Sequence, residues 1–466
     1  MGIRTPRLMC TQHPDSTVRL TAQDEVAEAI QARIHYGCDE VMVDYEGKLT
    51  PYSQPKEIVL KALSHGIDLG DGFYLTVRIP NPLLEELDRV MLSIDAALMA
   101  NYYSLMEREV QAVRWIVLPM TESGELVALV QRILAKKTRL LNEELNTRIE
   151  PIVLVPLLES FESLTRASLV TEALKVALQS ESGELRLVRL FLGKSDTAVK
   201  SGHIASSLAL LYALSQLHDL SLALSLPIKP IIGMGSPPFR GGINNPELVD
   251  VEVEQYSGYS TVTIQSAIRY DVGMSDYSKV RMTLLERVDE TPRRVDESAL
   301  SIAEKARSAY KSLVAKYADM VAETAKHVPT TRDRVAWRVY GRLVESETGV
   351  FHMPRAIVYT STWYLLGVPP TLLDASFIVQ AYREDLLDEV FRILPGLERE
   401  WSLDSLFYVP SVAEKRLDSK IVELVNTALD ILGIKREHDE AYARILSLGP
   451  SEAVALALGR MRGYLG

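Results

Sequence analysis

Polar and charged side chains follow most of the short apolar runs in the first 270 residues of the chain. A histidine lies in LMCTQHPDST (His13), single acidic residues lie in PLLESFESL (Glu159) and GKSDTAVKSGH (Asp196), and an arginine lies in the glycine-containing stretch GMGSPPFRGG (Arg240). Carboxylates together with arginines and a histidine, without a His/Cys cluster, are typical of a site for a hard cation such as Mg²⁺ or Mn²⁺. The arginines would then bind phosphate or carboxylate groups of a ligand.

Each of these residues also has an ordinary structural explanation. Glu159 could complement the dipole at the start of a helix, Asp196 could be a helix N-cap, and His13 could be a structural loop histidine. A glycine-containing turn with one arginine is a weak signal of phosphate binding. The joint occurrence of such residues after successive runs is what favours a ligand site.

Eight short apolar runs predict the strands that position these residues. Each run is followed by a longer segment with helical periodicity, and several are apolar on both faces, as buried parallel strands are. Their spacing leaves room for a strand, a crossover helix and two loops. The runs are 8–12, 40–45, 73–79, 114–120, 151–158, 186–193, 229–235 and 260–267.

Eight such units favour a closed (β/α)₈ barrel of the TIM type over an open doubly wound sheet, and no GxGxxG turn follows an early run. We expect the barrel to span residues 1–275. Residues 276–466 contain charged segments with helical periodicity, which predict a large, mainly helical region. Because no low-complexity linker separates the two parts, we expect the helical region to pack on the barrel as one structural unit. Chemistry in such barrels takes place at the carboxyl ends of the strands.

Composition narrows the classes of partner. The chain of 466 residues has a formal charge of −11, which opposes binding to a polyphosphate backbone, so nucleic acid is not an expected partner. The most hydrophobic stretch, 204–228, is interrupted by polar and charged residues, which indicates a buried helix and no membrane association. The two cysteines, Cys10 and Cys38, cannot build a disulfide framework and have no zinc-binding spacing, which fits a reducing cytoplasm.

Several segments match the signatures of a known family, in the order of that family. They are TQHPDST (11–17), VDYEGKLTPY (43–52), RIPNP (78–82), GSPPFRGG (235–242), and PRAI followed by LLGVPP (354–370). With these segments and this length, the chain resembles archaeal-type phosphoenolpyruvate carboxylase, a compact relative of the larger bacterial and plant enzymes.

The resemblance implies roles for the residues singled out above. The larger relatives carry an essential histidine in TAHPT, and His13 is its counterpart, which implies a catalytic role. Glu159 and Asp196 fall on the two acidic positions that hold the metal, Mg²⁺ or Mn²⁺. Arg240 corresponds to the second arginine of the glycine loop, HGRGGSxxRGG, and is also implied to be catalytic. The sequence departs from the pattern at the first arginine of that loop, where Met234 stands.

The resemblance also implies substrate-binding residues. Gln265 in TVTIQSAIRYD and Arg355 in PRAI match positions of the larger relatives. Arg78 and Lys200 are candidates to replace the missing loop arginine, although Lys200 is displaced by one residue from the family's lysine. A later arginine of the larger enzymes falls on Pro369, so its role is unassigned.

The implied reaction joins phosphoenolpyruvate and bicarbonate to give oxaloacetate and phosphate, through carboxyphosphate and an enolate. His13 would take the carboxyphosphate proton or steady the phosphate, and Arg240 would neutralise growing negative charge. We expect the loop 233–242 to exclude water from the enolate by closing over the site. Family members are typically homotetramers, and we expect the same assembly here, in the cytoplasm.

The sequence leaves two other functions open. One is another metal-dependent barrel lyase that forms an enolate, which would share Glu159 and Asp196 but need neither bicarbonate nor His13. The other is a non-catalytic barrel paralogue, favoured only by the departure at Met234.

Overall fold

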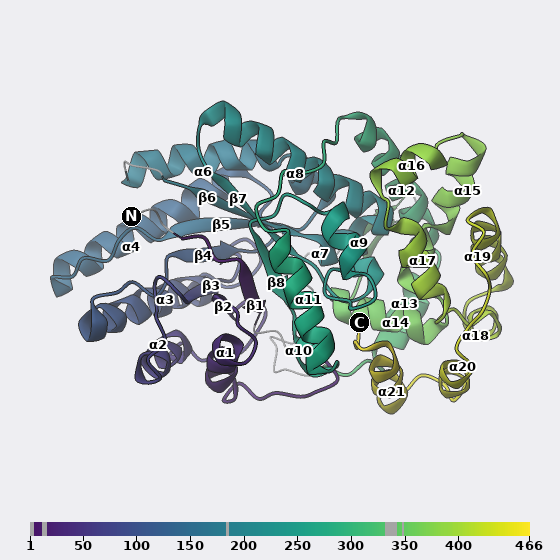
Figure 1. Cartoon of the computed structure of the whole chain (residues 1–466), viewed down its shortest axis with the longest axis horizontal. Helices are drawn as coiled ribbons and strands as arrows, with labels where there is room; N and C mark the ends of the chain where they lie inside the picture. Colours follow the sequence, from purple (N-terminus) through teal and green to yellow (C-terminus); the bar gives the residue numbers. More distant parts are fainter. Residues whose placement is uncertain (1–3, 12–15, 183–185, 331–342, 347–348) are drawn as a thin grey trace.

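Eight parallel strands form a closed barrel in chain order, and β8 pairs back with β1 (Figure 1). The computed structural model describes residues 4–11, 16–182, 186–330, 343–346 and 349–466. The strands are β1 Leu8–Thr11, β2 Glu40–Asp44, β3 Tyr74–Arg78, β4 Trp115–Leu118, β5 Val153–Leu158, β6 Val188–Gly193, β7 Ile228–Gly233 and β8 Thr261–Ile264. Each predicted run forms one strand, so the predicted (β/α)₈ barrel is confirmed.

Helices follow the strands and surround the barrel. They are α1 Glu25–Ile34, α2 Gln54–Ser64, α3 Leu87–Arg108, α4 Gly124–Leu145, α5 Phe161–Thr165, α6 Ala167–Ser182, α7 Lys194–Ser201, α8 His203–Leu224, the 3₁₀ turn η1 Pro238–Arg240, α9 Val249–Gln255, α10 Ser266–Tyr270 and α11 Met274–Glu286. The short elements α5, α7, η1 and α10 come directly after strands, so they carry the residues at the carboxyl ends of those strands.

The rest of the chain is mainly helical and gathers at one side of the barrel (Figure 1). Its elements are α12 Ser298–Ala315, α13 Ala318–Ala325, β9 Leu343–Ser346, β10 Gly349–His352, α14 Ala356–Leu366, η2 Pro370–Asp374, α15 Ala375–Arg383, α16 Leu387–Ile393, α17 Leu397–Ser405, α18 Pro410–Arg416, α19 Ser419–Ile431, α20 Glu440–Leu446 and α21 Glu452–Arg462. Helix α12 packs along α8, and α14 contacts α7. The boundary at residue 275 stays a prediction; α11 crosses it.

Helix α8 contains most of the apolar stretch noted in the sequence. Its length and composition would allow it to cross a membrane, but 56% of its most apolar window is buried inside the protein. It packs against α6, α7 and α12. This packing accounts for its apolar character, since a helix that is hydrophobic on all sides suits the interior of a large protein.

The interior of the barrel contains a buried ion pair far from the carboxyl ends of the strands. Arg189 on β6 donates to both carboxylate oxygens of Glu40 on β2, at 2.8 and 2.7 Å, and both side chains are fully buried. Arg189 also donates to Thr261 at 3.0 Å and lies 4.4 Å from the ring centre of Trp115. The pair links strands on different sides of the barrel.

The cysteines depart from the expectation that they stay reduced. Cys10 on β1 and Cys38, just before β2, form a disulfide, with Cα atoms 5.9 Å apart. The two strands are parallel neighbours, and Cys10 pairs in register with Val41. Residues distant in sequence thus meet without a CxxC motif. Because disulfides also occur inside cells of hyperthermophiles, the cysteines do not decide the compartment.

Candidate active site

A cavity of about 110 Å³ lies at the carboxyl ends of the barrel strands. Its wall contains six of the residues predicted from the sequence: Arg78, Glu159, Asp196, Arg240, Gln265 and Arg355. Glu46, Ser195, Thr11 and the apolar side chains of Met42, Leu157 and Phe191 also line it. His13 lies outside the described residues, two positions after Thr11. The structure therefore brings the acidic and basic candidates together around one small space.

Glu159 follows β5 and is not the cap of the next helix. Ser160 is the N-cap of α5 and forms a capping box with Ser163. The main-chain N–H groups of Ser160 and Ser163 at the start of this helix therefore have acceptors without Glu159. One oxygen of Glu159 accepts a bond from the main-chain N–H of Met120 at 3.1 Å. The helix-dipole explanation of Glu159 thus accounts for little of its placement, because its carboxylate reaches the cavity wall.

Asp196 lies in the first turn of α7 and is not its N-cap, which is Gly193. A Cβ atom at Gly193 would lie 2.9 Å from Cγ of Glu159. Glycine at the end of β6 therefore leaves the space that the Glu159 side chain occupies. The ends of two adjacent strands, β5 and β6, can bring their acidic residues to the same cavity for this reason.

The environment of Glu159 disfavours its ionised form. Burial, followed by the negative charges of Asp196 and Glu46, raises the pKa of Glu159 to about 8. A divalent cation would remove this penalty, and carboxylate oxygens suit Mg²⁺ or Mn²⁺. Among the described residues, no group of three or more His, Cys, Asp or Glu is arranged to hold a metal. Two carboxylates still fit Mg²⁺, which usually keeps several water ligands.

The raised pKa of Glu159 predicts how the stability of the metal-free protein depends on pH. Between about pH 4.5, the ordinary value, and about pH 8 the folded protein holds a proton on Glu159 that the unfolded chain has lost. The free energy of unfolding should therefore fall as pH rises through this window, by up to about 1.4 kcal/mol per pH unit. Chemical denaturation of the metal-free protein at pH 5 to 8 measures this slope. It should be smaller in Glu159→Gln, and an unchanged slope would assign the effect to other groups.

Changing Gly193 to alanine should weaken cation binding. The added Cβ would press on Glu159 and move its carboxylate away from Asp196. We expect Mn²⁺ affinity, measured by titration with electron paramagnetic resonance, to fall about 10- to 100-fold. Gly273→Ala is the matched control, because the nearest atom to its Cβ would be 4.0 Å away. Equal Mn²⁺ affinity in the two variants would contradict this role of Gly193.

Arg240 is held by contacts from different parts of the chain. Its Nε donates to Ser195 at 3.1 Å, one terminal nitrogen donates to Gln265 at 2.9 Å, and the other donates to a main-chain oxygen of Gly466. Arg355 reaches the same cavity from the helical region, where it is the N-cap residue of α14. The cationic side of the site therefore needs both the barrel and the region after it.

The candidate Lys200 and the residue Met234, where the sequence departs from the family pattern, do not line the cavity. Nζ of Lys200 donates to the main-chain oxygen of Glu159 at 2.9 Å, so Lys200 supports the loop after β5 instead of lining the cavity. Met234, at the position of the missing arginine, is fully buried in the hydrophobic core. A Cβ at Gly241 would lie 2.6 Å from its sulfur, which shows how tightly that side chain is packed.

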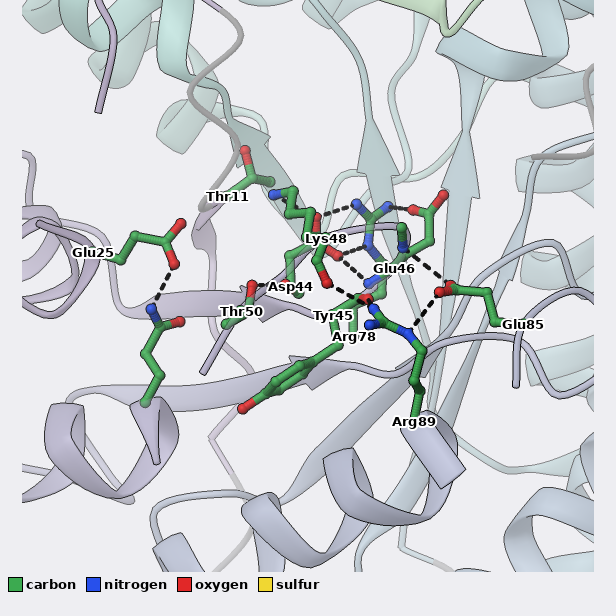
Figure 2. Close-up of polar contacts among 12 residues, drawn as sticks. Thr11, Glu25, Asp44, Tyr45, Glu46, Lys48, Thr50, Arg78, Glu85 and Arg89 are labelled. Carbon is green, nitrogen blue, oxygen red and sulfur yellow. Dashed lines mark hydrogen bonds and ion pairs between the residues drawn. The ribbon is translucent and has the colours of Figure 1, made fainter. Parts of the chain in front are cut away.

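Arg78 is held by a network with Asp44 and Glu46, polar residues at the end of the second predicted strand that were not proposed as site residues. Its Nε and Nη2 donate to Asp44, both at 2.8 Å, and its Nη1 contacts Glu46 at 2.8 Å (Figure 2). Nζ of Lys48 lies 2.5 Å from Asp44. Asp44, Glu46 and Lys48 all belong to the segment VDYEGKLTPY, so their charges were the available signal.

Comparison with known proteins gives consistent matches over the whole chain. The family model described as phosphoenolpyruvate carboxylase matches residues 5–466. The chain belongs to the phosphoenolpyruvate carboxylase family. The phosphoenolpyruvate carboxylase of Thermofilum pendens is 58% identical over 464 residues, covering 100% of both chains. That of Pyrobaculum calidifontis is 50% identical over 462 residues, covering 99% of each, and that of Methanosarcina acetivorans is 29% identical over 485 residues, covering 95% of this chain and 91% of the relative.

Membership of the phosphoenolpyruvate carboxylase family confirms the resemblance seen in the sequence. The sequence signatures end near residue 370, whereas the family match continues to residue 466. The helical region is therefore part of what phosphoenolpyruvate carboxylases of this kind share, together with the barrel.

Proposed function

We propose that the chain is an enzyme that carboxylates phosphoenolpyruvate with bicarbonate to give oxaloacetate and phosphate, in a reaction that depends on Mg²⁺ or Mn²⁺. The observation that carries the proposal is the single cavity at the strand ends that joins Glu159 and Asp196 to Arg240 and Arg355. Its carboxylates suit a hard cation and its arginines suit a small phosphorylated acid. The family match over nearly the whole chain supports the same activity.

Glu159 and Asp196 would hold the cation. When bound, the cation supplies positive charge that stabilises an enolate oxygen and the substrate carboxylate. The raised pKa of Glu159 fits this role, because a carboxylate crowded by other negative charges gains most from a cation. The remaining steps concern side chains of the protein itself.

Arg240 would bind bicarbonate and the phosphate that leaves. Its contacts with Ser195 and Gln265 fix the plane of its guanidinium, and fixed donors stabilise developing charge without reorganising. Arg355 and Arg78 would bind the phosphate and carboxylate of phosphoenolpyruvate. The transfer of phosphate to bicarbonate then leaves the enolate beside carboxyphosphate.

His13 would accept the proton of carboxyphosphate, which then releases CO₂ for capture by the enolate carbon. An imidazole titrates near neutrality and suits this role. Water must stay away, because it would protonate the enolate to pyruvate. Met42, Leu157 and Phe191 give the cavity an apolar wall, and the buried loop 233–242 contributes Gly233 and Arg240 to it.

An assay of oxaloacetate and phosphate with and without bicarbonate tests the proposed reaction. We expect equal amounts of both products, and none in bicarbonate-free buffer. Phosphate or pyruvate release independent of bicarbonate would favour another enolate-forming lyase, and binding of Mn²⁺ and phosphoenolpyruvate without phosphate release would favour a non-catalytic paralogue.

His13→Asn should lower oxaloacetate formation about 10²- to 10⁴-fold while substrate binding persists.

We further propose a homotetramer in the cytoplasm. The family resemblance supports the homotetramer. Light scattering of the purified protein after gel filtration measures the assembly, and a mass other than four chains would contradict it.

A further inference from the structure

The carboxylate of Glu46 has no part in the catalysis proposed above, although it lines the same cavity. The side chain is almost fully buried, and its Oε2 contacts Nη1 of Arg78 at 2.8 Å. Its other oxygen, Oε1, is buried and has no hydrogen-bond partner among the residues that the structure describes. Leaving a buried carboxylate oxygen unpaired costs free energy, so its place on the cavity wall indicates a partner that arrives with the ligands.

Asp44 differs from Glu46 because its contacts are complete. It binds Nε and Nη2 of Arg78 and also contacts Lys48 (Figure 2). Burial works against the ionised form of Asp44, but the charges of Arg78 and Lys48 outweigh it and hold its pKa well below the ordinary value. Asp44 can therefore keep Arg78 in place whether or not Glu46 stays on Nη1.

The main chain on both sides of Glu46 is fixed. The N–H of Gly47 donates to Glu85 at 3.0 Å. Arg89 donates to the carbonyl oxygen of Tyr45 at 3.0 Å (Figure 2). Glu85 and Arg89 are themselves paired at 3.0 Å. Movement of the Glu46 carboxylate thus requires only rotations of its own side chain.

Glu46 also lies within electrostatic reach of Glu159. Its charge is one of the causes of the raised pKa of Glu159, after burial and the charge of Asp196. The guanidinium of Arg78 attracts the carboxylate of Glu46. A cation bound near Glu159 and Asp196 would attract it as well.

We propose that Glu46 is a positioning residue that couples binding of the cation to binding of the substrate phosphate or carboxylate. Without a cation, Glu46 occupies Nη1 of Arg78 and neutralises it toward anions. With a cation near Glu159 and Asp196, Glu46 turns its unpaired oxygen toward the cation or one of its water ligands, and Nη1 becomes available to the anion. The inference rests on the proposed function for the identity of that anion as phosphoenolpyruvate.

Calorimetric titration of Glu46→Gln tests the coupling without turnover. Inorganic phosphate and phosphoenolpyruvate are titrated in bicarbonate-free buffer, with and without Mn²⁺. Because glutamine carries no charge, Nη1 of Arg78 loses its anionic partner, whereas Asp44 keeps its contacts with Nε and Nη2. We therefore expect both anions to bind the metal-free variant about tenfold more tightly than the parent. The gain in anion affinity caused by Mn²⁺ should shrink by a similar factor, since coupling between two sites is reciprocal.

Glu85→Gln is the matched control. Glu85 is also a buried carboxylate and accepts the N–H of Gly47, but it pairs with Arg89 and does not line the cavity. It should show the anion affinities of the parent. In an Arg78→Gln background, Glu46→Gln should have no further effect on anion binding. If Glu46→Gln does not fold, Glu46→Asp replaces it, since the shorter side chain should lose contact with Arg78.

Equal or weaker phosphate binding by metal-free Glu46→Gln would overturn the inference, as would the same gain in Glu85→Gln. The proposed function fails separately, if the parent protein makes no oxaloacetate. In that case the titration with inorganic phosphate still decides the role of Glu46.

Discussion

Glu159→Gln is expected to lower kcat/KM for oxaloacetate formation by at least about 10²-fold, the usual cost of losing one group that stabilises developing charge. Glutamine keeps the size of the side chain and removes the charge that faces Asp196. Mn²⁺ binding, followed by electron paramagnetic resonance, should weaken in parallel, because a cation prefers an ionised oxygen ligand. The two measurements together show whether the loss of activity follows the loss of cation binding.

Glu122→Gln is the control for this change. Glu122 follows the neighbouring strand β4, is exposed, and accepts a bond from Ser160 at 2.8 Å. It thus touches the loop that carries Glu159 without lining the cavity. Full activity of Glu159→Gln, or equal losses in both variants, would remove Glu159 from the proposed metal site.

Glu40→Gln is expected to destabilise the protein by about 3–5 kcal/mol, because it leaves the charge of Arg189 buried without a counter-ion. Both side chains are fully buried in the barrel, so water cannot replace the lost partner. Unfolding in guanidinium chloride, followed by circular dichroism, measures the change. The effect should be confined to stability, since neither residue lines the cavity at the strand ends.

The ion pair between Arg114 and Glu150 provides the comparison. Its N–O distance is 2.7 Å, but the side chain of Glu150 is 65% exposed. Glu150→Gln should therefore change the free energy of unfolding by only about 0–1 kcal/mol. Similar losses in the two variants would mean that burial of the Glu40 pair does not set its contribution.

The strands were predictable because each is a short apolar run that ends in polar, glycine or proline residues. The run ending at Leu158 and the one ending at Gly193 placed Glu159 and Asp196 at adjacent strand ends, and the structure has both on one cavity wall. Arg240 was singled out by its glycine-containing turn, and Gln265 and Arg355 were proposed from the family resemblance; all three also line this cavity. Their roles stay predictions, as does that of His13, which lies outside the described residues.

What the sequence could not provide is the pairing of side chains across strands. Asp44 and Arg78 are direct partners in the register of β2 and β3. Because of this register, Arg78 is paired with Asp44 where it reaches the cavity. Cys10 and Cys38 meet for the same kind of reason. Arg240 contacts Gly466, which is 226 residues away. None of these contacts has a local pattern, because each depends on how distant segments are placed in three dimensions.

The disulfide bears on how the barrel closes during folding. It joins residues 28 positions apart, and a cross-link over a segment of that length lowers the entropy of the unfolded chain by an amount equivalent to about 3–4 kcal/mol. Closure requires β1 to pair with β8, where Leu8 lies beside Val262, and contacts so far apart in sequence form slowly. An unfolded chain that keeps this bond already holds β1 next to the segment of β2. When β1 pairs with β8 to close the barrel, it is then already tethered to the segment of β2.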